Sequence, residues 1–357
     1  MARKLEPENP SYLFTLGHVC TRTDRIAQAR TAYEDAIQLS VDNDIAIGEL
    51  VNLAGEEDRE NTLQDIAHEF TQQTNFGDGL LTFRDQAVNV IDSDDLLRIF
   101  QGLLDGHPEI WQCWSVTIQQ LIICVRLEES LELAREAVEH FPLLSRLWID
   151  LADVYRARNE IEPRIDSLRQ AVLVAPGWSF AARELAEALD SQHQGEEARV
   201  VLEQAVARSP LDSVNHGYLA DNLWNSGESE LAIDRLSIAL RLDPGYDWAW
   251  RTLGDWCERM DLPEKTREIA RMVADTRPGD YRAWLACARM IHGREHLEDA
   301  IDALNQAIAL NPRSIEAHDL KAERLAELGR SRRLCPARRQ AFAVSPDESQ
   351  EPPFARR

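Results

Sequence analysis

The chain has 357 residues, of which 44% are hydrophobic and 28% charged, which is the composition of a folded protein with an apolar interior. Its net charge of -23 argues against general binding to nucleic-acid phosphates or anionic lipid, because both attract basic proteins. No stretch approaches the roughly 18–20 apolar residues of a membrane span, and no apolar run follows the basic residues near the start. We therefore expect no membrane segment, no signal peptide and no nucleic-acid partner.

The six cysteines are scattered along the chain and include no CxxC pair, which is unlike the framework of a small disulfide-rich protein. Free thiols in a reducing compartment fit this pattern better, so the expected location is the cytoplasm. Cys257 and Cys287 occupy helix positions that other repeats fill with core residues. We expect both thiols to be buried and unreactive.

The first 107 residues carry a weak pattern of paired helices. Gly17 and Cys20 share one predicted helix face, and Ala29 and Tyr33 share a second. Two more helix pairs are expected before Pro108, at less regular spacing. These three units are interpreted as degenerate copies of the unit that follows them.

From Pro108 onward, proline recurs every 34 residues. Proline is tolerated at a helix start or in the turn after a helix, so each of these prolines marks the same kind of break. A fixed period of this length indicates one supersecondary unit stacked many times, which is typical of binding scaffolds. The series is Pro108, Pro142, Pro176, Pro210, Pro244, Pro278, Pro312 and Pro346.

Each period contains two helices separated by a short turn. Bulky and small residues stand three or four apart in both halves, so they share a face in each helix. Small residues on both helices let the two backbones approach closely. The sixth residue after a proline is tryptophan in four repeats: Trp114, Trp148, Trp250 and Trp284. The tenth residue is small: Ala152, Ala186, Ala220, Gly254, Ala288 and Ala322. In the second helices an alanine recurs at one position: Ala137, Ala171, Ala205, Ala239 and Ala307.

At these residues the chain resembles the tetratricopeptide repeat family, most clearly from Asn215 to Pro244 and from Ala283 to Pro312. The resemblance implies an all-α fold, a right-handed superhelical solenoid of about ten helix–turn–helix repeats, with protein partners held in a groove lined by the first helices. The expected domains are degenerate repeats over residues 1–107, regular repeats over 108–346 and a disordered tail over 347–357.

The segment from Arg330 onward is basic, with seven arginines and three acidic residues. Two interpretations stay open for it: a docking tail on an otherwise acidic protein, or a solvated end, including the end of a fragment.

The family's geometry places the groove-facing side chains eight and eleven residues after each proline. Seven of ten such positions, from Asp150 to Glu323, are acidic, and several arginines lie close by in sequence. An acidic groove attracts cations, so the sequence predicts a protein or peptide partner rich in Lys and Arg, although the same acids also suit a merely solvated face. The predicted partner-binding residues are Asp150, Asp153, Glu184, Glu187, Tyr218, Asp221, Trp224, Trp248, Asp255 and Glu323.

Two short motifs suggest metal binding, and each has a simpler explanation. His292–His296 fits HxxEH, but Gly293 breaks the continuous helix that a zinc site needs. Asp92–Asp95 lacks the glycine and glutamate of a calcium loop, so we expect Asp92 to cap a helix instead. No metal, cofactor or catalytic residue is predicted.

A non-catalytic interaction scaffold is the leading hypothesis for function. The alternatives are a repeat arm or subunit of a larger enzyme complex, including a transferase subunit of the prenyltransferase α type, which the segments Pro244–Trp250 and Pro278–Trp284 resemble. Self-association is left undecided by the sequence.

Overall fold

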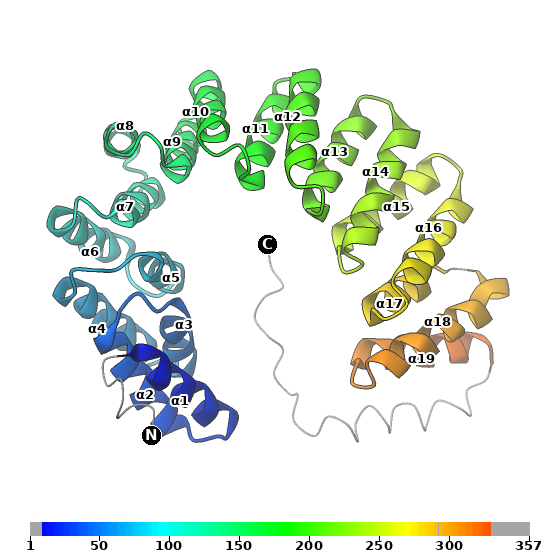
Figure 1. The fold of residues 1–357 in the computed structure, drawn as a ribbon, viewed down its shortest axis with the longest axis horizontal. Helices are drawn as coiled ribbons and strands as arrows, with labels where there is room; N and C mark the ends of the chain where they lie inside the picture. The colour runs from blue at the N-terminus through cyan, green and yellow to red at the C-terminus, as the bar shows by residue number, and fades with distance from the viewer. Residues whose placement is uncertain (1–8, 292, 330–357) are drawn as a thin grey trace. The chain divides into compact units, whose positions relative to one another are not determined.

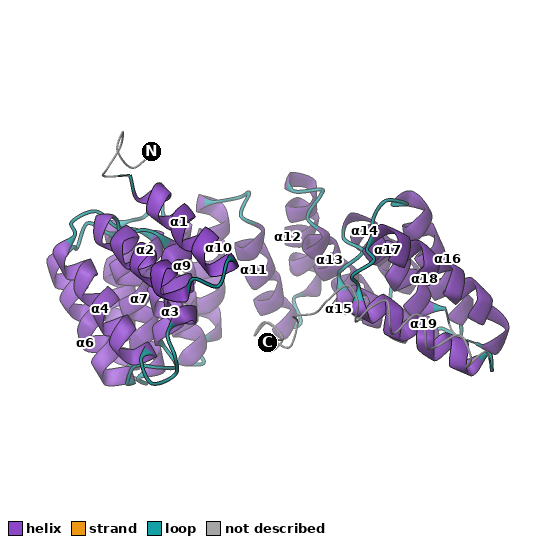
Figure 2. Ribbon diagram, turned by 90° about the horizontal axis from the view of Figure 1, so that it is seen from below, coloured by secondary structure: helices purple, strands orange, loops and turns teal. Residues whose placement is uncertain are grey.

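The computed structural model describes residues 9–291 and 293–329, and every regular element in them is helical (Figure 2). The nineteen α-helices of this described part form nine helix pairs, and α19 stands as the first helix of a tenth. The expected all-α repeat architecture is confirmed. Pro346, Cys335, the basic segment after Arg330 and the expected tail lie outside the described residues.

The chain divides into two compact units, Met1–Ala188 and Leu189–Arg357, called here the N-terminal and C-terminal units. Figure 1 shows consecutive helix pairs side by side within each of them. No helix in the described part is long and apolar enough to cross a membrane.

In the N-terminal unit the helices alternate between first and second members of each pair. They are α1 (Pro10–Arg22), α2 (Ile26–Leu39), α3 (Asp44–Leu53), α4 (Arg59–Gln72), α5 (Asp78–Ala87), α6 (Ser93–Gly106), α7 (Trp111–Ile123), α8 (Leu127–His140), α9 (Ser145–Ala157) and α10 (Ile161–Val174).

Helix α11 (Ser179–Ser191) crosses the division between the units. The C-terminal unit continues with α12 (Gly195–Arg208), α13 (Ser213–Asn225), α14 (Ser229–Leu242), α15 (Asp247–Arg259), α16 (Pro263–Thr276), α17 (Tyr281–Met290), the 3-10 turn η2 (Arg294–His296), α18 (Leu297–Leu310) and α19 (Ile315–Glu327).

The turn inside a helix pair closes in the same way in five consecutive repeats. One residue adopts a left-handed conformation, at 34-residue intervals, and the next N–H bonds a carbonyl five residues back, as Arg126 does to Leu121 at 2.9 Å. This is the Schellman ending, for which glycine is the favoured residue. Only one of the five is glycine: they are Val125, Asn159, His193, Gly227 and Asp261.

In every repeat from Pro108 to Pro312 except the one that begins at Pro176, which has Ala182 at this position, a ring nitrogen bonds the carbonyl of the repeat proline. The indole Nε1–H of Trp250 donates to the Pro244 oxygen at 2.9 Å, and the same contact recurs in the other three tryptophan repeats. Where histidine takes the tryptophan position, Nε2 of His216 and of His318 lies 3.0 Å from the corresponding oxygen. Because a carbonyl only accepts, these ring nitrogens donate.

The core consists of the small residues that the sequence predicted, with larger side chains beside them. Ala152, Ala220 and Ala288 are buried in first helices, and Ala137 and Ala239 in second helices. The first three pairs use aromatic rings as well: Phe70 contacts Phe76 and Phe83, with ring centroids 5.2 and 5.6 Å apart. Aromatic rings therefore fill core space in the first three pairs, whereas small residues that allow close backbone approach fill it in the later repeats.

Predictions for individual core and capping residues are also confirmed. Asp92 accepts hydrogen bonds from the Asp94 and Asp95 N–H groups and caps α6. Cys257 and Cys287 are buried, and burial raises the pKa of the Cys287 thiol to about 11.

Candidate partner-binding surfaces

The predicted partner-binding residues fall on first helices of both units. Asp150 and Asp153 lie on α9, and Glu184 and Glu187 lie on the part of α11 that belongs to the N-terminal unit. The C-terminal unit carries the other six, distributed over helices α13, α15 and α19. The two sets are described separately because their surroundings differ in kind.

Asp150 is fully buried and therefore has no exposed surface for a partner. Its Oδ1 accepts hydrogen bonds from Gln119 Nε2 at 2.7 Å and from Arg146 Nε at 3.2 Å, which joins α9 to α7. Burial raises the pKa of the Asp150 carboxyl, while Arg146 lowers it. The prediction from spacing did not anticipate this burial, and we assign Asp150 to helix packing.

Asp153 and Glu184 belong to a network with two arginines. Arg156 lies 2.8 Å from Asp153 and 3.7 Å from Glu184, and Arg164 of α10 lies 3.6 Å from Glu184. Burial raises the pKa of Asp153 to about 6, against the opposing effect of Arg156. The acidic side chains of α9 and α11 here are thus largely neutralised by the protein itself, and only Glu187 stands exposed.

In the C-terminal unit, α13 and α15 meet through aromatic rings packed on a glycine. A Cβ at Gly217 would lie 2.8 Å from the Tyr246 hydroxyl and 3.1 Å from the Trp248 ring, so only glycine allows this approach. The Tyr246 and Trp248 rings are themselves 5.6 Å apart. Tyr218, the next residue on α13, keeps 36% of its surface exposed.

A second aromatic contact joins the same two helices. Trp224 of α13 stacks parallel on Trp256 of α15, with ring centroids 4.5 Å apart. Trp256 is buried, whereas Trp224 is half-buried. The pair holds one indole in the core and leaves part of the other accessible.

Two half-buried carboxylates, Asp190 at the end of α11 and Asp221 of α13, are bonded to asparagines of α13. Asp190 accepts a hydrogen bond from Asn222 Nδ2 at 3.0 Å, and Asp221 accepts one from Asn225 Nδ2 at 3.2 Å. Within the described residues, no ion pair reaches either carboxylate. Burial raises the pKa of both, and the charge of Asp221 adds to the rise at Asp190. We call the set Asp190, Tyr218, Asp221, Trp224 and Trp248 the α13–α15 face.

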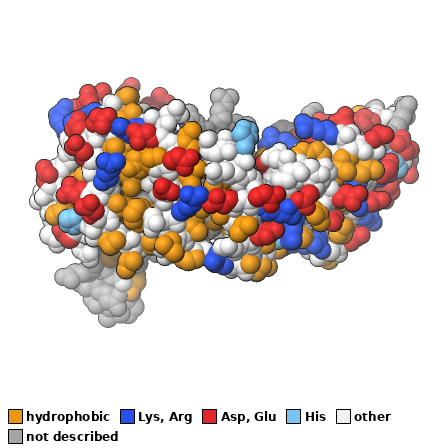
Figure 3. Space-filling model, turned by 90° about the horizontal axis from the view of Figure 1, so that it is seen from above, with side chains coloured by type: hydrophobic (Ala, Val, Ile, Leu, Met, Phe, Trp, Pro, Cys, Tyr) orange, Lys and Arg blue, Asp and Glu red, His pale blue; other side chains and the backbone are white. Residues whose placement is uncertain are grey.

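The two remaining predicted residues are ordinary surface acids. Asp255 pairs with Arg259 at 3.2 Å, with both side chains more than 60% exposed, and Glu323 of α19 is exposed. On the side of the molecule drawn in Figure 3, acidic and basic side chains are intermixed with hydrophobic ones. The sequence predicted that the first helices form a mostly negative groove lining. This remains a prediction, and only for some of the first helices.

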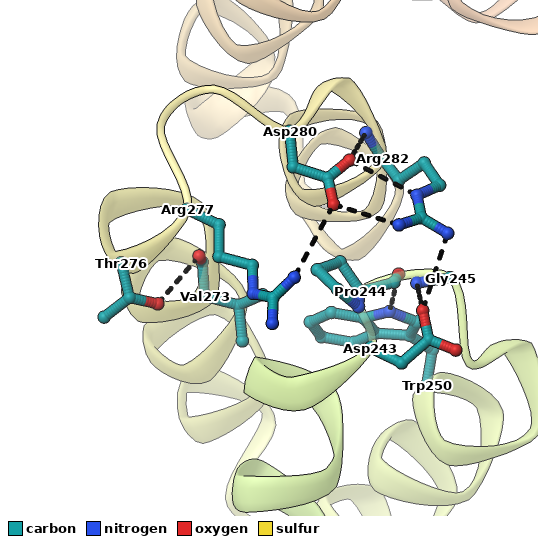
Figure 4. Close-up of polar contacts among 9 residues, drawn as sticks. All are labelled: Asp243, Pro244, Gly245, Trp250, Val273, Thr276, Arg277, Asp280 and Arg282. Carbon is teal, nitrogen blue, oxygen red and sulfur yellow. Dashed lines mark hydrogen bonds and ion pairs between the residues drawn. The ribbon is translucent and has the colours of Figure 1, made fainter. Parts of the chain in front are cut away.

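The loop before α15 is held by a charged contact to Arg282 at the start of α17, which in turn pairs with the loop before α17 (Figure 4). Arg282 lies 3.7 Å from Asp243 and 3.2 Å from Asp280, and Arg277 reaches Asp280 at 4.0 Å. Burial acts to raise the pKa of Asp280, but the bonds from Arg282 outweigh it and lower that pKa. These contacts fix the start of α15, the helix whose Trp248 packs against Gly217.

Some residues of these surfaces were not found by sequence reasoning. Asp190, Tyr246 and Trp256 lie outside the two offsets that were considered, and Arg164 lies on a second helix. Gly217 was a usable signal, because a glycine inside a helix commonly marks the close approach of another group. Glu295 and His296 of the HxxEH motif lie at the turn before α18, and His292 lies outside the described residues.

Comparisons with known proteins agree with the repeat architecture. A family model described as tetratricopeptide repeat matches residues 10–43, which is the first helix pair. The plant protein NPGR1 of Arabidopsis thaliana is 24% identical over 198 residues, which is 54% of this chain and 28% of that protein. The chain thus spans under a third of this relative's length.

Solved structures of repeat proteins are similar at low identity. The Thermus thermophilus protein TTC0263 is 16% identical with a TM-score of 0.39, covering 50% of this chain and 96% of its own. YrrB, described as a tetratricopeptide repeat protein with an unusual peptide-binding site, is 19% identical with a TM-score of 0.38, covering 52% and 95%. The Cut9–Hcn1 assembly is 15% identical with a TM-score of 0.38, covering 95% and 74%.

Proposed function

We propose, from the premise that this chain is a tetratricopeptide repeat protein, that it is a non-catalytic scaffold whose α13–α15 face binds a Lys/Arg-containing segment of another protein. Its fold is that of protein–protein interaction scaffolds. The observation that carries the finer proposal is the pair of half-buried carboxylates, Asp190 and Asp221, which are bonded to asparagines of α13 and lack an arginine or lysine partner among the described residues.

The electrostatics favour a cationic ligand at this face. Burial makes the charged form of each carboxylate costly, and a bound ammonium or guanidinium group offsets that cost. A cation over an exposed tryptophan or tyrosine ring gains a further ~1 kcal/mol. Tyr218 stands three residues before Asp221 on α13, and Trp224 stands three residues after it. The two rings therefore neighbour the carboxylate along the helix.

Two buried thiols are poor candidates for a catalytic nucleophile, which is in keeping with the non-catalytic part of the proposal. Burial raises the pKa of Cys113 to about 12 and that of Cys287 to about 11, so neither thiol is a ready nucleophile. Five cysteines are free thiols, which supports the proposed cytoplasmic location.

The test is a titration of a labelled Arg/Lys-rich peptide, followed by fluorescence anisotropy. We expect affinity to fall as salt rises from ~0.05 to ~0.5 M, because screening shortens the range of the charge attraction. Asp190→Asn with Asp221→Asn should weaken binding by about tenfold, which corresponds to ~1.4 kcal/mol.

Asp234→Asn is the matched control, because it removes an exposed acid from the second helix α14 in the same unit. It should leave the affinity within about twofold of the unmodified protein, as expected for a distant exposed charge. Affinity that is indifferent to salt, preference for an acidic peptide, or equal losses in the two variants would contradict the proposal.

A further inference from the structure

A groove between two second helices, α6 and α8, is built differently from the surfaces described above. It has a volume of about 420 Å³ and lies within the N-terminal unit. None of the predicted partner-binding residues lines it. We call it the α6–α8 groove; its lining consists of Gln101, Leu104, Asp105, Thr117, Leu121, Glu129, Glu132, Leu133 and Glu136.

The groove combines apolar side chains with acidic ones. Leu121 is buried and Leu104 and Leu133 are half-buried, so leucine side chains supply its apolar part. Asp105, Glu132 and Glu136 are exposed, and none of the three has an ion pair or hydrogen bond among the described residues. Half-buried leucines and unpaired carboxylates in one groove indicate a surface suited to an amphipathic, positively charged occupant.

Another groove in the same unit also lies between two second helices, but there an arginine of the protein itself pairs with the acidic side chains. The groove between α2 and α4 has a volume of about 290 Å³ and is lined by Arg30 as well as by acids. Arg30 lies 3.0 Å from Glu34 and donates to the Thr62 hydroxyl at 3.5 Å. In the α6–α8 groove no lining residue is basic, and among the described residues Glu129 alone has a cationic partner, Arg126, from outside the lining.

The spacing of the acids defines the partner further. Glu132 and Glu136 stand four residues apart on α8, so they project one above the other along the groove. A helix laid into a groove presents side chains at the same interval and buries its apolar positions between them. Two cations one turn apart with a leucine-sized side chain between them match the two acids and the leucines.

We propose that the α6–α8 groove is a second docking surface, which takes an amphipathic helical segment of a partner protein with Lys or Arg one turn apart beside an apolar anchor. It uses second helices, so it goes beyond the proposed function of the α13–α15 face. The two surfaces share a preference for cations, and the tests are chosen to separate them.

The probe is a synthetic helical peptide with lysines four residues apart flanking a leucine, and its affinity is measured by isothermal titration calorimetry. Glu132→Gln with Glu136→Gln should weaken binding by about tenfold, or ~1.4 kcal/mol. Leu133→Ser should weaken it too, although it changes no charge. A peptide with glutamate in place of the lysines should bind at least about ten times more weakly than the probe, because of like-charge repulsion.

Glu136→Gln and Glu139→Gln form a matched pair, since both residues are exposed acids of α8 but Glu139 lies outside the groove lining. Only the first should reduce affinity. Equal effects of the pair, or no effect of Leu133→Ser, would overturn the proposal. Loss of binding in the Asp190→Asn, Asp221→Asn variant with no loss in the groove variants would also overturn it and assign the peptide to the α13–α15 face.

Circular dichroism melting of each variant completes the test. The glutamine substitutions lie at exposed positions, so their melting curves should coincide with that of the unmodified protein. Leu133→Gln, which keeps a side chain of similar length, is the second apolar-site variant and must weaken binding in a folded protein if the leucine contact contributes.

Discussion

The two units use acidic side chains on their first helices in opposite ways. In the N-terminal unit, Asp150 and Asp153 contact arginines of their own helix α9, and Glu184 of α11 contacts Arg156 of α9 and Arg164 of α10. In the C-terminal unit, Asp190 and Asp221 accept hydrogen bonds from asparagines of α13. Acidic residues on first helices therefore pair with the protein's own arginines in one unit, and in the other they are the carboxylates that we propose contact a ligand.

The largest expected effect is on the buried pair of the N-terminal unit. Arg146→Ala leaves the Asp150 carboxylate buried with only neutral donors such as Gln119, and should lower the free energy of unfolding by about 2 kcal/mol. Urea unfolding followed by circular dichroism measures the change. Adding Asp150→Asn should restore part of the loss, because no buried charge then lacks its partner; an unchanged midpoint in the single variant would show that the pair is not structural.

A pH dependence should follow from Asp153. Its pKa is raised to about 6 in the folded protein, so the native state binds this proton more tightly than the unfolded state does. Stability from this group is therefore present at low pH and is lost as pH rises from about 4 to about 6, by an amount on the order of 2 kcal/mol.

Asp153→Asn removes the titrating group, so the difference in unfolding free energy between variant and unmodified protein should change across that pH window. Asp255→Asn in the C-terminal unit is the control, because Asp255 is exposed and paired only at the surface. A difference that stays constant with pH for Asp153→Asn would contradict the assignment of its raised pKa to burial.

A smaller effect is expected at the turns. Val125 adopts φ 58° although its side chain is branched at Cβ and 76% exposed. Val125→Gly should raise stability by about 1 kcal/mol, because the left-handed conformation costs valine this much and little packing is lost. Gly227→Val, at the equivalent turn of the C-terminal unit, should lower it by a similar amount, and thermal melting of both variants checks the sign.

The smallest effect should be at the surface pair of the C-terminal unit. Arg259→Ala removes the ion pair with Asp255, in which both side chains are more than 60% exposed, and should change stability by no more than about 0.5 kcal/mol. A loss as large as that of Arg146→Ala would mean that the two units do not differ in the way described here.

Helix pairs, breaks and core alanines were predictable because a 34-residue period repeats each of them many times. The contacts of individual side chains were not predictable from the sequence, because they depend on which side chain the neighbouring repeat supplies. Asp150 and Tyr218 share an offset from their prolines, yet Asp150 is buried against Gln119 and Tyr218 is exposed. Spacing assigned both to one groove, and only packing distinguishes them.

The arginine pairings illustrate the same point. Arg156 and Arg164 stand at positions where the sequence alone allows many partners, and their contacts with Glu184 depend on how α9, α10 and α11 cross. The approach of Tyr246 and Trp248 to Gly217 was readable in part, because a helix glycine is itself a signal.

The hydrogen bond to the repeat proline's oxygen has a consequence for how such repeats diverge. Trp250 and His216 deliver a ring N–H to equivalent oxygens at 2.9 and 3.0 Å, despite their difference in size. Tryptophan and histidine share a ring N–H donor that phenylalanine lacks, so either can make this bond, while Ala182 shows that one repeat does without it. A search for related repeats that requires a large aromatic residue at this position would overlook the repeats that carry histidine.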